Sequence, residues 1–251
     1  LIMVTTPETL GSLLIAPKLK DSLRNARVIV VDEVHELVDS KRGSQLSLAL
    51  QRLRKRSGEL QVIGLSATVG DEGKVAQFLS QKAVVLKVEL PRKMNLSVEF
   101  PEKFPQKIDG LMRADAESKA RAWRVVELIN ESKSTLVFTN TRSLAESLAS
   151  TLLQLDEVKD KLGVHHGSLA REARVQAEAD FKKGDKIKAI VCTSSLELGI
   201  DIGSVDLVVQ YHSPRQATRL VQRVGRSGHR KDLVPKGVLL PYNALDAAES
   251  A

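Results

Sequence analysis

Two acidic residues directly follow a short apolar run near the beginning of the chain. Residues Val28–Val31 read VIVV, and Asp32 and Glu33 come next. A carboxylate at such a strand end can hold Mg²⁺ through the water shell of the ion, because magnesium favours oxygen ligands and retains water. A neighbouring glutamate can orient or deprotonate an attacking water. The pair therefore indicates nucleotide hydrolysis; the alternative is an acidic helix-capping loop, of the kind that Asp39 and Ser40 could also form.

Hydroxyl, amide and imidazole groups follow most of the other apolar runs. After VIGL, TLVF, LGV and AIVC come Ser66-Ala67-Thr68, Thr139-Asn140-Thr141-Arg142, His165-His166-Gly167-Ser168 and Thr193-Ser194-Ser195. Ligands bind beyond the carboxyl ends of strands in open parallel sheets. Hydroxyls, amides and backbone N–H groups suit phosphate contacts that carry no sequence information. The alternative for each is helix capping, and one residue can do both, because a helix N-terminus is itself an anion site.

A basic segment near the end of the chain has the composition of a helix that contacts phosphate. It reads QRVGRSGH over residues 222–229, and Arg223 and Arg226 are expected to share one helix face because they are three residues apart. An arginine at a γ-phosphate stabilises charge in the transition state and raises the rate of other NTPases by roughly 10³–10⁵. The alternative, a solvated basic helix, does not need Gly225 and Gly228.

Two series of alternating strands and helices would position these groups. In the first, predicted strands at Leu1–Thr5, Val28–Val31, Val62–Ser66 and Ala83–Val88 alternate with helical stretches PETLGSLLI, SQLSLALQRLRKR and EGKVAQFLS. In the second, predicted helices at Ala116–Ser132, Arg142–Leu155, Arg171–Lys182 and Gln216–Arg226 alternate with strands TLVFT, LGVHH, KAIVCT, VDLVVQ and KGVLLPY. This alternation predicts an α/β protein with covered parallel sheets. The proline-rich stretch between the series, Glu89–Lys107, predicts a linker that could include one edge strand.

The composition suits a soluble protein with a polyanionic partner. Of the 251 residues, 42% are apolar and 27% are charged, as is ordinary for a soluble globular protein. The length is sufficient for two compact domains. The chain has 38 basic and 31 acidic residues, and this net positive charge of +7 favours contacts with phosphate. Aromatic residues make up only 3% of the chain, which argues against a surface that stacks bases in series. No apolar run approaches the length of a membrane span. A single cysteine, Cys192, excludes an internal disulfide, predicts core packing and fits a reducing cytoplasm.

Six segments occur in the order of the superfamily 2 helicase motifs Ib to VI. They read TTPETL, DEVH, SAT, TLVFTNTR, TSSLELGID and QRVGRSGH. The residues of these segments resemble the large helicase-related family of DNA helicases. The resemblance covers essentially the whole chain, and the last two segments are the most specific. The resemblance implies two RecA-like lobes with parallel sheets and flanking helices. Residues 1–90 would be the C-terminal part of an incomplete first lobe, 91–112 a linker, and 113–251 the second lobe.

The resemblance also assigns roles in ATP hydrolysis. Glu33 would be the catalytic base and Arg226 the first candidate for the arginine at the γ-phosphate, with Arg223 as a weaker one. The residues at the nucleotide and its Mg²⁺ would be Asp32, which holds the metal through water, together with Gly199, Asp201 and His229. Many superfamily 2 proteins have a third arginine where this chain has His229 and then Arg230, which puts the contact from that position in doubt.

A further set of residues would contact nucleic acid or couple it to the nucleotide. The nucleic-acid candidates are Thr5, Thr6, Asn140, Thr141, Arg142, His166, Gly167, Ser168, Thr193 and Ser194. The coupling candidates are His35, Ser66 and Thr68; Ser66 and Thr68 could also cap the helix expected to begin near Asp71-Glu72, in place of the coupling role or together with it.

No Gly-Lys-Ser/Thr string of the kind that cradles the β- and γ-phosphates occurs in the 251 residues. Because Asp32, Glu33 and the arginine segment are all present, we expect the sequence to begin partway through the first lobe, with further domains after it in the full-length chain. The fragment alone would then not hydrolyse ATP. The other account is a degenerate paralogue that does not hydrolyse ATP at all.

The function expected from the resemblance is an ATP-dependent helicase that uses ATP and Mg²⁺ and unwinds DNA in the 3′-to-5′ direction, in repair or recombination. Its partner would be single-stranded or forked DNA, and it would be a cytoplasmic, monomeric motor without a membrane segment. Two alternatives remain. One is an RNA helicase, because contacts to the 2′-hydroxyl cannot be read from sequence; the other is a non-catalytic nucleic-acid-binding module. An upstream Gly-Lys-Ser/Thr loop would favour the motor.

Overall fold

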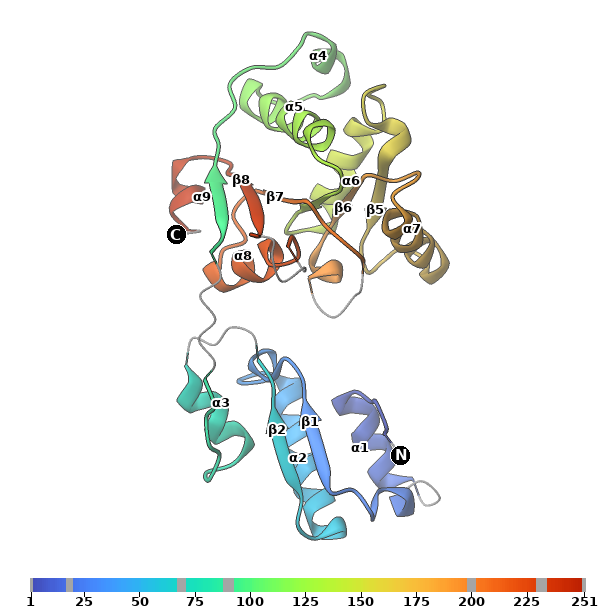
Figure 1. Ribbon diagram of the computed structural model, residues 1–251, viewed down its shortest axis with the longest axis vertical. Helices are drawn as coiled ribbons and strands as arrows, with labels where there is room; N and C mark the ends of the chain where they lie inside the picture. Colours follow the sequence, from blue (N-terminus) through green and yellow to red (C-terminus); the bar gives the residue numbers. More distant parts are fainter. Residues whose placement is uncertain are drawn as a thin grey trace. The chain divides into compact units, whose positions relative to one another are not determined.

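The computed structural model describes residues 2–16, 20–66, 71–87, 93–197, 202–228 and 234–249. The chain forms two compact units, Leu1–Glu89 and Leu90–Ala251 (Figure 1). Each unit contains a parallel sheet with helices packed against it. This arrangement confirms the predicted α/β class.

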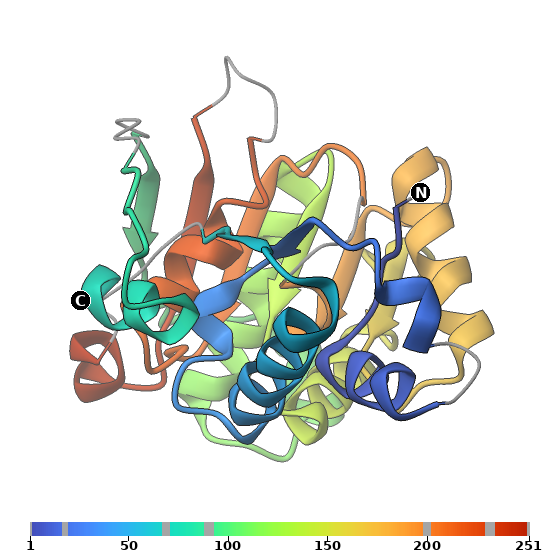
Figure 2. The same ribbon diagram turned by 90° about the horizontal axis from the view of Figure 1, so that it is seen from below.

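The first unit is built around two parallel strands. Its elements are α1 (Pro7–Ile15), η1 (Lys20–Leu23), β1 (Val28–Val31), η2 (Val34–Glu36), α2 (Lys41–Ser57), β2 (Gln61–Gly64) and α3 (Glu72–Leu79). In the β1–β2 pair, Val28 lies opposite Gln61 and Val31 opposite Gly64. Helix α2 packs against this sheet, and α1 packs against α2 (Figure 1 and Figure 2).

Local sequence explains where the main helix of this unit begins and ends. The hydroxyl of Ser40 accepts a hydrogen bond from the N–H of Gly43 and caps the start of α2. Leu46, Leu50 and Leu53, spaced at helical intervals, are buried on one face. The helix ends at Gly58, whose φ of 76° is accessible to glycine at little cost. The amphipathic pattern therefore determined which face of α2 meets the sheet.

Two strands predicted for this unit are wrong. Residues 2–6 and 83–87 have no strand pairing, and Val4 and Leu86 are 94% and 88% exposed. A strand is stabilised by hydrogen bonds to a neighbouring strand, and the β1–β2 sheet supplies none to these segments. Apolar composition alone does not make a strand. Leu1 and Val88, the outer ends of the two predictions, lie outside the described residues.

The second unit contains a six-stranded parallel sheet in the order β3-β8-β7-β4-β6-β5. Its strands are β3 (Asn95–Val98), β4 (Thr135–Phe138), β5 (Leu162–His165), β6 (Ala189–Cys192), β7 (Leu207–Tyr211) and β8 (Lys236–Leu240). Its helices are α4 (Lys107–Leu111), α5 (Ala116–Glu131), α6 (Arg142–Leu152), η3 (Lys159–Lys161), α7 (Arg171–Lys183), η4 (Ser194–Leu196), α8 (Ala217–Val224) and α9 (Ala244–Ala248).

Helices cover both faces of this sheet (Figure 1). Val137 of β4 packs in a core with α4, α5 and α6. Its neighbours Leu136 and Phe138 point to the other face, in a core with α7 and α8. A strand buried on both faces is continuously apolar, as the TLVF sequence of β4 is. Cys192 is buried in β6, which confirms its predicted role in core packing.

Part of the segment predicted as a linker, residues 91–112, folds with the second unit. β3 pairs with β8 at the edge of the sheet, with Asn95 opposite Lys236. Ile108 of α4 is fully buried in the core beside α5. An edge strand within this stretch was allowed by the sequence, and the structure places it in the sheet of the second unit.

Candidate nucleotide and nucleic-acid site

The acidic pair of the first unit lies at the carboxyl end of β1. Asp32 is exposed, and its Oδ1 accepts a hydrogen bond from the backbone N–H of Glu33 at 3.0 Å. Glu33 has φ 47° and ψ 45°, a left-handed conformation that is uncommon outside glycine. Its Oε2 atom is buried and lies 3.6 Å from Nδ1 of His35, but it accepts no hydrogen bond from any residue that the structure describes. Both backbone strain and an unsatisfied buried acceptor are typical of functional sites.

This pair is suited to Mg²⁺ held with water. The described parts of the chain contain no cluster of three or more His, Cys, Asp or Glu side chains that could enclose a metal. Mg²⁺ usually takes one or two carboxylates and completes its shell with water and substrate phosphate. An exposed Asp32 carboxylate beside the unsatisfied Glu33 oxygen fits that donor set.

His35 and Ser66 join the ends of the two strands of this unit. The Nδ1 atom of His35 lies 2.7 Å from Oγ of Ser66, which follows β2. Ser66 does not cap α3, because Asp71 does so by accepting a hydrogen bond from the N–H of Lys74. The helix-capping alternative for Ser66 is therefore wrong. Thr68, the third coupling candidate, lies outside the described residues.

Arg226 lies in the turn after α8 and not on the helix itself. α8 ends at Val224, so the prediction that Arg223 and Arg226 share a helix face is wrong. The Nε atom of Arg226 donates to the backbone carbonyl of Glu197 at 2.9 Å, and the side chain is half-buried. The Ser227 hydroxyl stabilises this turn by donating back to the carbonyl of Val224 at 2.7 Å.

Arg223 is buried in the interior of the second unit. It is 1% exposed. Its Nη1 donates to Oε1 of Gln210 at 2.8 Å, and its Nη2 donates to Oε2 of Glu197 at 3.3 Å. Burial lowers the pKa of its guanidinium, while the neighbouring Glu197 carboxylate opposes that shift. Both partners belong to the same unit as Arg223. A contact with phosphate requires a guanidinium that reaches solvent, and the guanidinium of Arg223 does not.

The nucleic-acid candidates of the second unit gather at one edge of its sheet. The register aligns Phe138 with Cys192 and His165 with Cys192, so the residues after β4, β5 and β6 meet there. Those residues are Asn140, Thr141, Arg142, His166, Gly167, Ser168, Thr193 and Ser194. Most of them are exposed; His166 is buried and Thr193 is half-buried. In the first unit, Thr5 and Thr6 are exposed just before α1.

Capping accounts for some of these hydroxyls. Thr6 accepts a hydrogen bond from the N–H of Thr9 at 3.3 Å, and Thr141 accepts one from Leu144 at 3.2 Å. These two residues cap α1 and α6. Ser168 caps no helix, because α7 begins after Ala170 without a side-chain cap. Its exposed hydroxyl therefore has no such structural explanation.

An acidic side chain lies among the basic candidates at the end of β4. Oε1 of Glu146 accepts a hydrogen bond from Nε of Arg142 at 2.8 Å and lies 3.3 Å from Nε2 of His166. The hydrogen bond from Arg142 holds the pKa of this carboxyl below its usual range. Glu146 was not among the residues predicted from the sequence.

Glu197 and Gln210 were not predicted from the sequence either. Glu197 is part of the TSSLELGID segment, and Gln210 is a polar residue at a fully buried position of β7; an amide in a strand of valines was the available signal. Three predicted residues of the nucleotide site, Gly199, Asp201 and His229, lie outside the described residues, as does Arg230.

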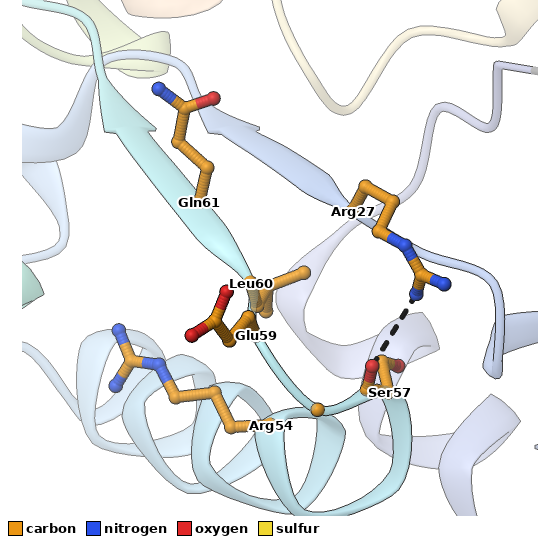
Figure 3. Close-up of a pocket in the computed structure, with 7 residues that line it drawn as sticks. Arg27, Arg54, Ser57, Glu59, Leu60 and Gln61 are labelled. Atoms are coloured by element: carbon orange, nitrogen blue, oxygen red, sulfur yellow. Dashed lines mark hydrogen bonds between the residues drawn. The ribbon is translucent and has the colours of Figure 1, made fainter.

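Figure 3 shows a depression of about 850 Å³ at the end of the first unit's sheet where β2 begins. It is lined by Arg27, Arg54, Ser57, Gly58, Glu59, Leu60 and Gln61. Nη1 of Arg27 donates to the carbonyl of Ser57 at 3.4 Å. Asp32 and Ser66 follow the other ends of β1 and β2, so this depression is separate from the candidate site.

Two stretches of the chain match known protein families. Residues 1–75 match the family described as DEAD/DEAH box helicase, and residues 119–231 match the helicase conserved C-terminal domain. Within the parts that the structure describes, no helix has the length and apolar character needed to cross a membrane.

Two relatives illustrate the similarity in sequence. The ATP-dependent helicase Lhr-Core of Methanothermobacter thermautotrophicus is 39% identical, over 99% of this chain and 29% of that protein. The Lhr helicase/uracil glycosylase of Escherichia coli is 33% identical, over 100% of this chain and 19% of its own length. The chain thus spans less than a third of the length of these relatives.

Solved structures extend the similarity to the fold. The Mycobacterium smegmatis helicase Lhr bound to ssDNA and AMP-PNP matches with a TM-score of 0.83 at 38% identity, over 98% of this chain and 32% of that one. S. cerevisiae Dbp5 bound to RNA and ADP BeF3 matches with a TM-score of 0.74 at 20% identity, over 98% of this chain and 60% of that one, which supports the fold alone. The chain belongs to the DEAD/DEAH-box helicases of superfamily 2, and within them it is similar to the large helicase-related proteins.

Proposed function

We propose that this chain is the motor region of an ATP-dependent helicase that translocates on DNA. The observation that carries the proposal is the strained Glu33, whose buried Oε2 accepts no hydrogen bond among the described residues, beside the exposed carboxylate of Asp32. Leaving a buried acceptor unsatisfied costs about 1–3 kcal/mol. A water molecule on the path to a phosphate would satisfy it.

Glu33 would act as the catalytic base. Its unsatisfied oxygen would accept the proton of the attacking water, a role worth roughly 10²–10⁴ in rate where such groups are measured. Asp32 would hold Mg²⁺ through water, and the metal would supply charge neutralisation at the phosphates. The hydrogen bond from the Glu33 backbone N–H to Oδ1 fixes the orientation of the Asp32 carboxylate.

Arg226 would stabilise the charge that develops on the γ-phosphate. It is the half-buried arginine of the QRVGRSGH segment, whereas Arg223 is 1% exposed and engaged by Gln210 and Glu197. A guanidinium that can reach solvent is required for this contact. We therefore assign the catalytic arginine to Arg226 and a positioning role to Arg223; Gly199, Asp201 and His229 remain proposed nucleotide contacts by resemblance.

The residues after β4, β5 and β6 would hold the phosphates of a single strand. Arg142 supplies charge, Ser168 and Ser194 supply exposed hydroxyls, and Gly167 leaves space for close approach of the strand. Thr5, Thr6, Asn140, Thr141, His166 and Thr193 complete the proposed set. The contacts are to the backbone of the strand, which matches the low aromatic content.

The M. smegmatis helicase Lhr was solved bound to ssDNA, and this similarity supports DNA over RNA. We further propose 3′-to-5′ movement, a substrate of single-stranded or forked DNA, a role in repair or recombination, and a monomeric cytoplasmic protein in which this chain works with further domains. His35 and Ser66, with Thr68, would couple hydrolysis to movement.

The test is ATP hydrolysis by the whole protein, with and without single-stranded DNA or RNA. We expect DNA to raise the rate, and Glu33→Gln and Arg226→Ala to abolish hydrolysis while DNA binding persists. Glu59→Gln, an exposed glutamate at the opposite end of the first unit's sheet, is the matched control and should retain the rate. Stimulation by RNA alone would identify an RNA helicase, and a wild-type protein that binds DNA but hydrolyses no ATP would identify a binding module.

A further inference from the structure

One residue in the second unit, Glu197, contacts three arginines of the α8 region. Oε2 of Glu197 accepts from Nη2 of Arg223 at 3.3 Å, and Oε1 lies 3.4 Å from Nε of Arg219. The backbone carbonyl of the same residue accepts from Nε of Arg226 at 2.9 Å. Glu197 thus fixes two arginines through its side chain and a third through its main chain.

The Glu197–Arg223 ion pair lies in the interior. Its two side chains are 7% and 1% exposed. Removing charges from water is costly, and such a pair is retained only with good geometry and additional hydrogen bonds. Gln210 supplies one of these through its Oε1, and its own amide is fixed by a hydrogen bond to the carbonyl of His212 at 2.6 Å. The orientation of Arg223 is therefore set on two sides.

Arg223 also reaches the proposed nucleic-acid edge. Its Nη1 donates to Oδ1 of Asn140 at 3.3 Å, and Nδ2 of Asn140 donates to the carbonyl of Ser213. A continuous series of hydrogen bonds consequently runs from Asn140 through Arg223 and Glu197 to Arg226. Asn140 is exposed, so a strand that contacts it would act directly on one end of this series.

We propose that Glu197 is a positioning residue that couples strand binding at Asn140 to the placement of Arg226. Its side chain, held by Arg223, fixes the direction of the carbonyl on which the Arg226 guanidinium rests. A strand that shifts Asn140 shifts Arg223 and Glu197, and the guanidinium of Arg226 moves with the carbonyl. This inference rests on the proposed function, because it requires Arg226 to act on ATP.

Glu197→Gln tests the proposal in the whole protein. The amide keeps the size of the side chain and removes its charge. We expect DNA-stimulated kcat to fall about 10- to 100-fold, since a misplacement of about 1 Å can cost on the order of 10²-fold. The KM for ATP and the Kd for single-stranded DNA should stay within about twofold of wild type, because the Glu197 side chain is buried and is not one of the proposed ligand contacts. Glu172→Gln, an exposed glutamate on α7, is the matched control and should behave as wild type.

A second variant covers the case in which Glu197→Gln fails to fold. Arg219 is 40% exposed, so Arg219→Gln removes one partner of Glu197 while the buried carboxylate keeps its ion pair with Arg223. This variant should also lower DNA-stimulated kcat, by a smaller factor, with little change in the KM for ATP or the Kd for single-stranded DNA. Unchanged DNA-stimulated kcat in each variant that folds would overturn the proposal. So would a loss matched by equal weakening of DNA binding, because that result would indicate a merely structural role.

Hydrogen exchange separates this inference from the proposed function. Single-stranded DNA should slow amide exchange in peptides that span residues 217–228 of the wild-type protein, and the effect should vanish in Glu197→Gln. This measurement does not require ATP hydrolysis. A wild-type protein that hydrolyses no ATP but shows the DNA-dependent protection would contradict the proposed function and leave the coupling intact; absence of the protection would contradict the coupling.

Discussion

His35 and Ser66 connect the carboxyl ends of β1 and β2 through a contact of 2.7 Å between Nδ1 and Oγ. The two residues are 31 positions apart in the sequence. The imidazole also lies 3.6 Å from the Oε2 atom of Glu33 and 3.5 Å from a carboxylate oxygen of Glu36. A movement of the proposed catalytic glutamate would therefore reach the segment after β2 through one side chain.

We expect Ser66→Ala to uncouple hydrolysis from movement. The variant removes the hydrogen bond to His35, worth about 0.5–1.5 kcal/mol, and leaves the carboxylates in place. DNA-stimulated ATP hydrolysis should fall less than about threefold, while duplex unwinding falls about tenfold or more. Parallel ATPase and strand-displacement assays on the whole protein measure the ratio. Ser44→Ala in α2 is the control, and equal losses in both assays would refute a coupling role.

We expect the backbone conformation of Glu33 to lower the stability of the fold, although the side chain is needed for ATP hydrolysis. Its left-handed backbone costs about 1–2 kcal/mol in a residue with a Cβ atom. Glu33→Asn, which tolerates that conformation better, should raise the midpoint of thermal unfolding and abolish ATP hydrolysis. The comparison with Glu33→Gln, which keeps the strain, isolates the backbone effect. A lower midpoint for Glu33→Asn than for Glu33→Gln would show that the conformation carries no strain.

Replacing Arg223 should lower the free energy of unfolding more than replacing Arg226. Arg223→Ala leaves the buried Glu197 carboxylate without its interior partner, and breaking such a pair costs about 3–5 kcal/mol. Arg226→Ala removes the hydrogen bonds that Nε and Nη2 donate to the Glu197 carbonyl, with no buried carboxylate left unpaired, and should cost less than about 3 kcal/mol. Denaturant unfolding of both variants gives the comparison. Equal costs would contradict the structural role of Arg223.

Glu146 should weaken binding of single-stranded DNA. Its carboxylate contacts both Arg142 and His166, the two side chains that we propose for a strand phosphate, and would compete with that phosphate for them. Glu146→Gln should tighten binding about two- to fivefold at low salt, within the range of exposed ion pairs. The dependence of log Kd on log salt should become steeper by about 0.7 if one more phosphate is neutralised. Weaker binding would instead show that Glu146 supports the conformation of Arg142.

Glu157→Gln is the control for that measurement. Glu157 pairs with Lys107, away from the strand-end residues, and should leave DNA affinity unchanged. If both variants tighten binding equally, the effect reflects net charge and not the contact with Arg142.

His212 should make the second unit sensitive to acid. Burial lowers the pKa of its imidazole below the ordinary value near 6.5, and Arg121 lowers it further. The unfolded chain then binds a proton more readily than the folded one, so the stability contributed by neutral His212 is complete above about pH 6.5 and is lost as pH falls toward the lowered pKa. His212 has φ 66°, which asparagine tolerates.

The expected result is a smaller fall in unfolding midpoint between pH 7.5 and about pH 5.5 for His212→Asn than for wild type. The change at pH 7.5 itself reflects the lost stacking on Tyr211, whose ring centroid lies 4.6 Å away. The same fall in both proteins would assign the acid sensitivity to other groups.

Sequence periodicity predicted most elements of the second unit. The helix from Ala116 and the strand TLVF follow directly from an amphipathic pattern and from an apolar run, because each records which side of the element meets water. The polar residues after each strand were also identifiable, since parallel strands must bring their carboxyl ends to one edge. The family resemblance rested on those same residues.

The partners of the polar residues needed the tertiary structure. Arg223 and Arg226 look equivalent in QRVGRSGH, yet one is buried against Glu197 and Gln210 and the other lies in a turn. The contacts of Arg223 with Asn140 and Glu197 span 83 and 26 residues. Residues 2–6 and 83–87, apolar like β1, form no strand. Local sequence determines which side of a helix or strand faces water and which residues cap the nearby backbone. Contacts between residues far apart in the sequence depend on which strands the folded chain places side by side.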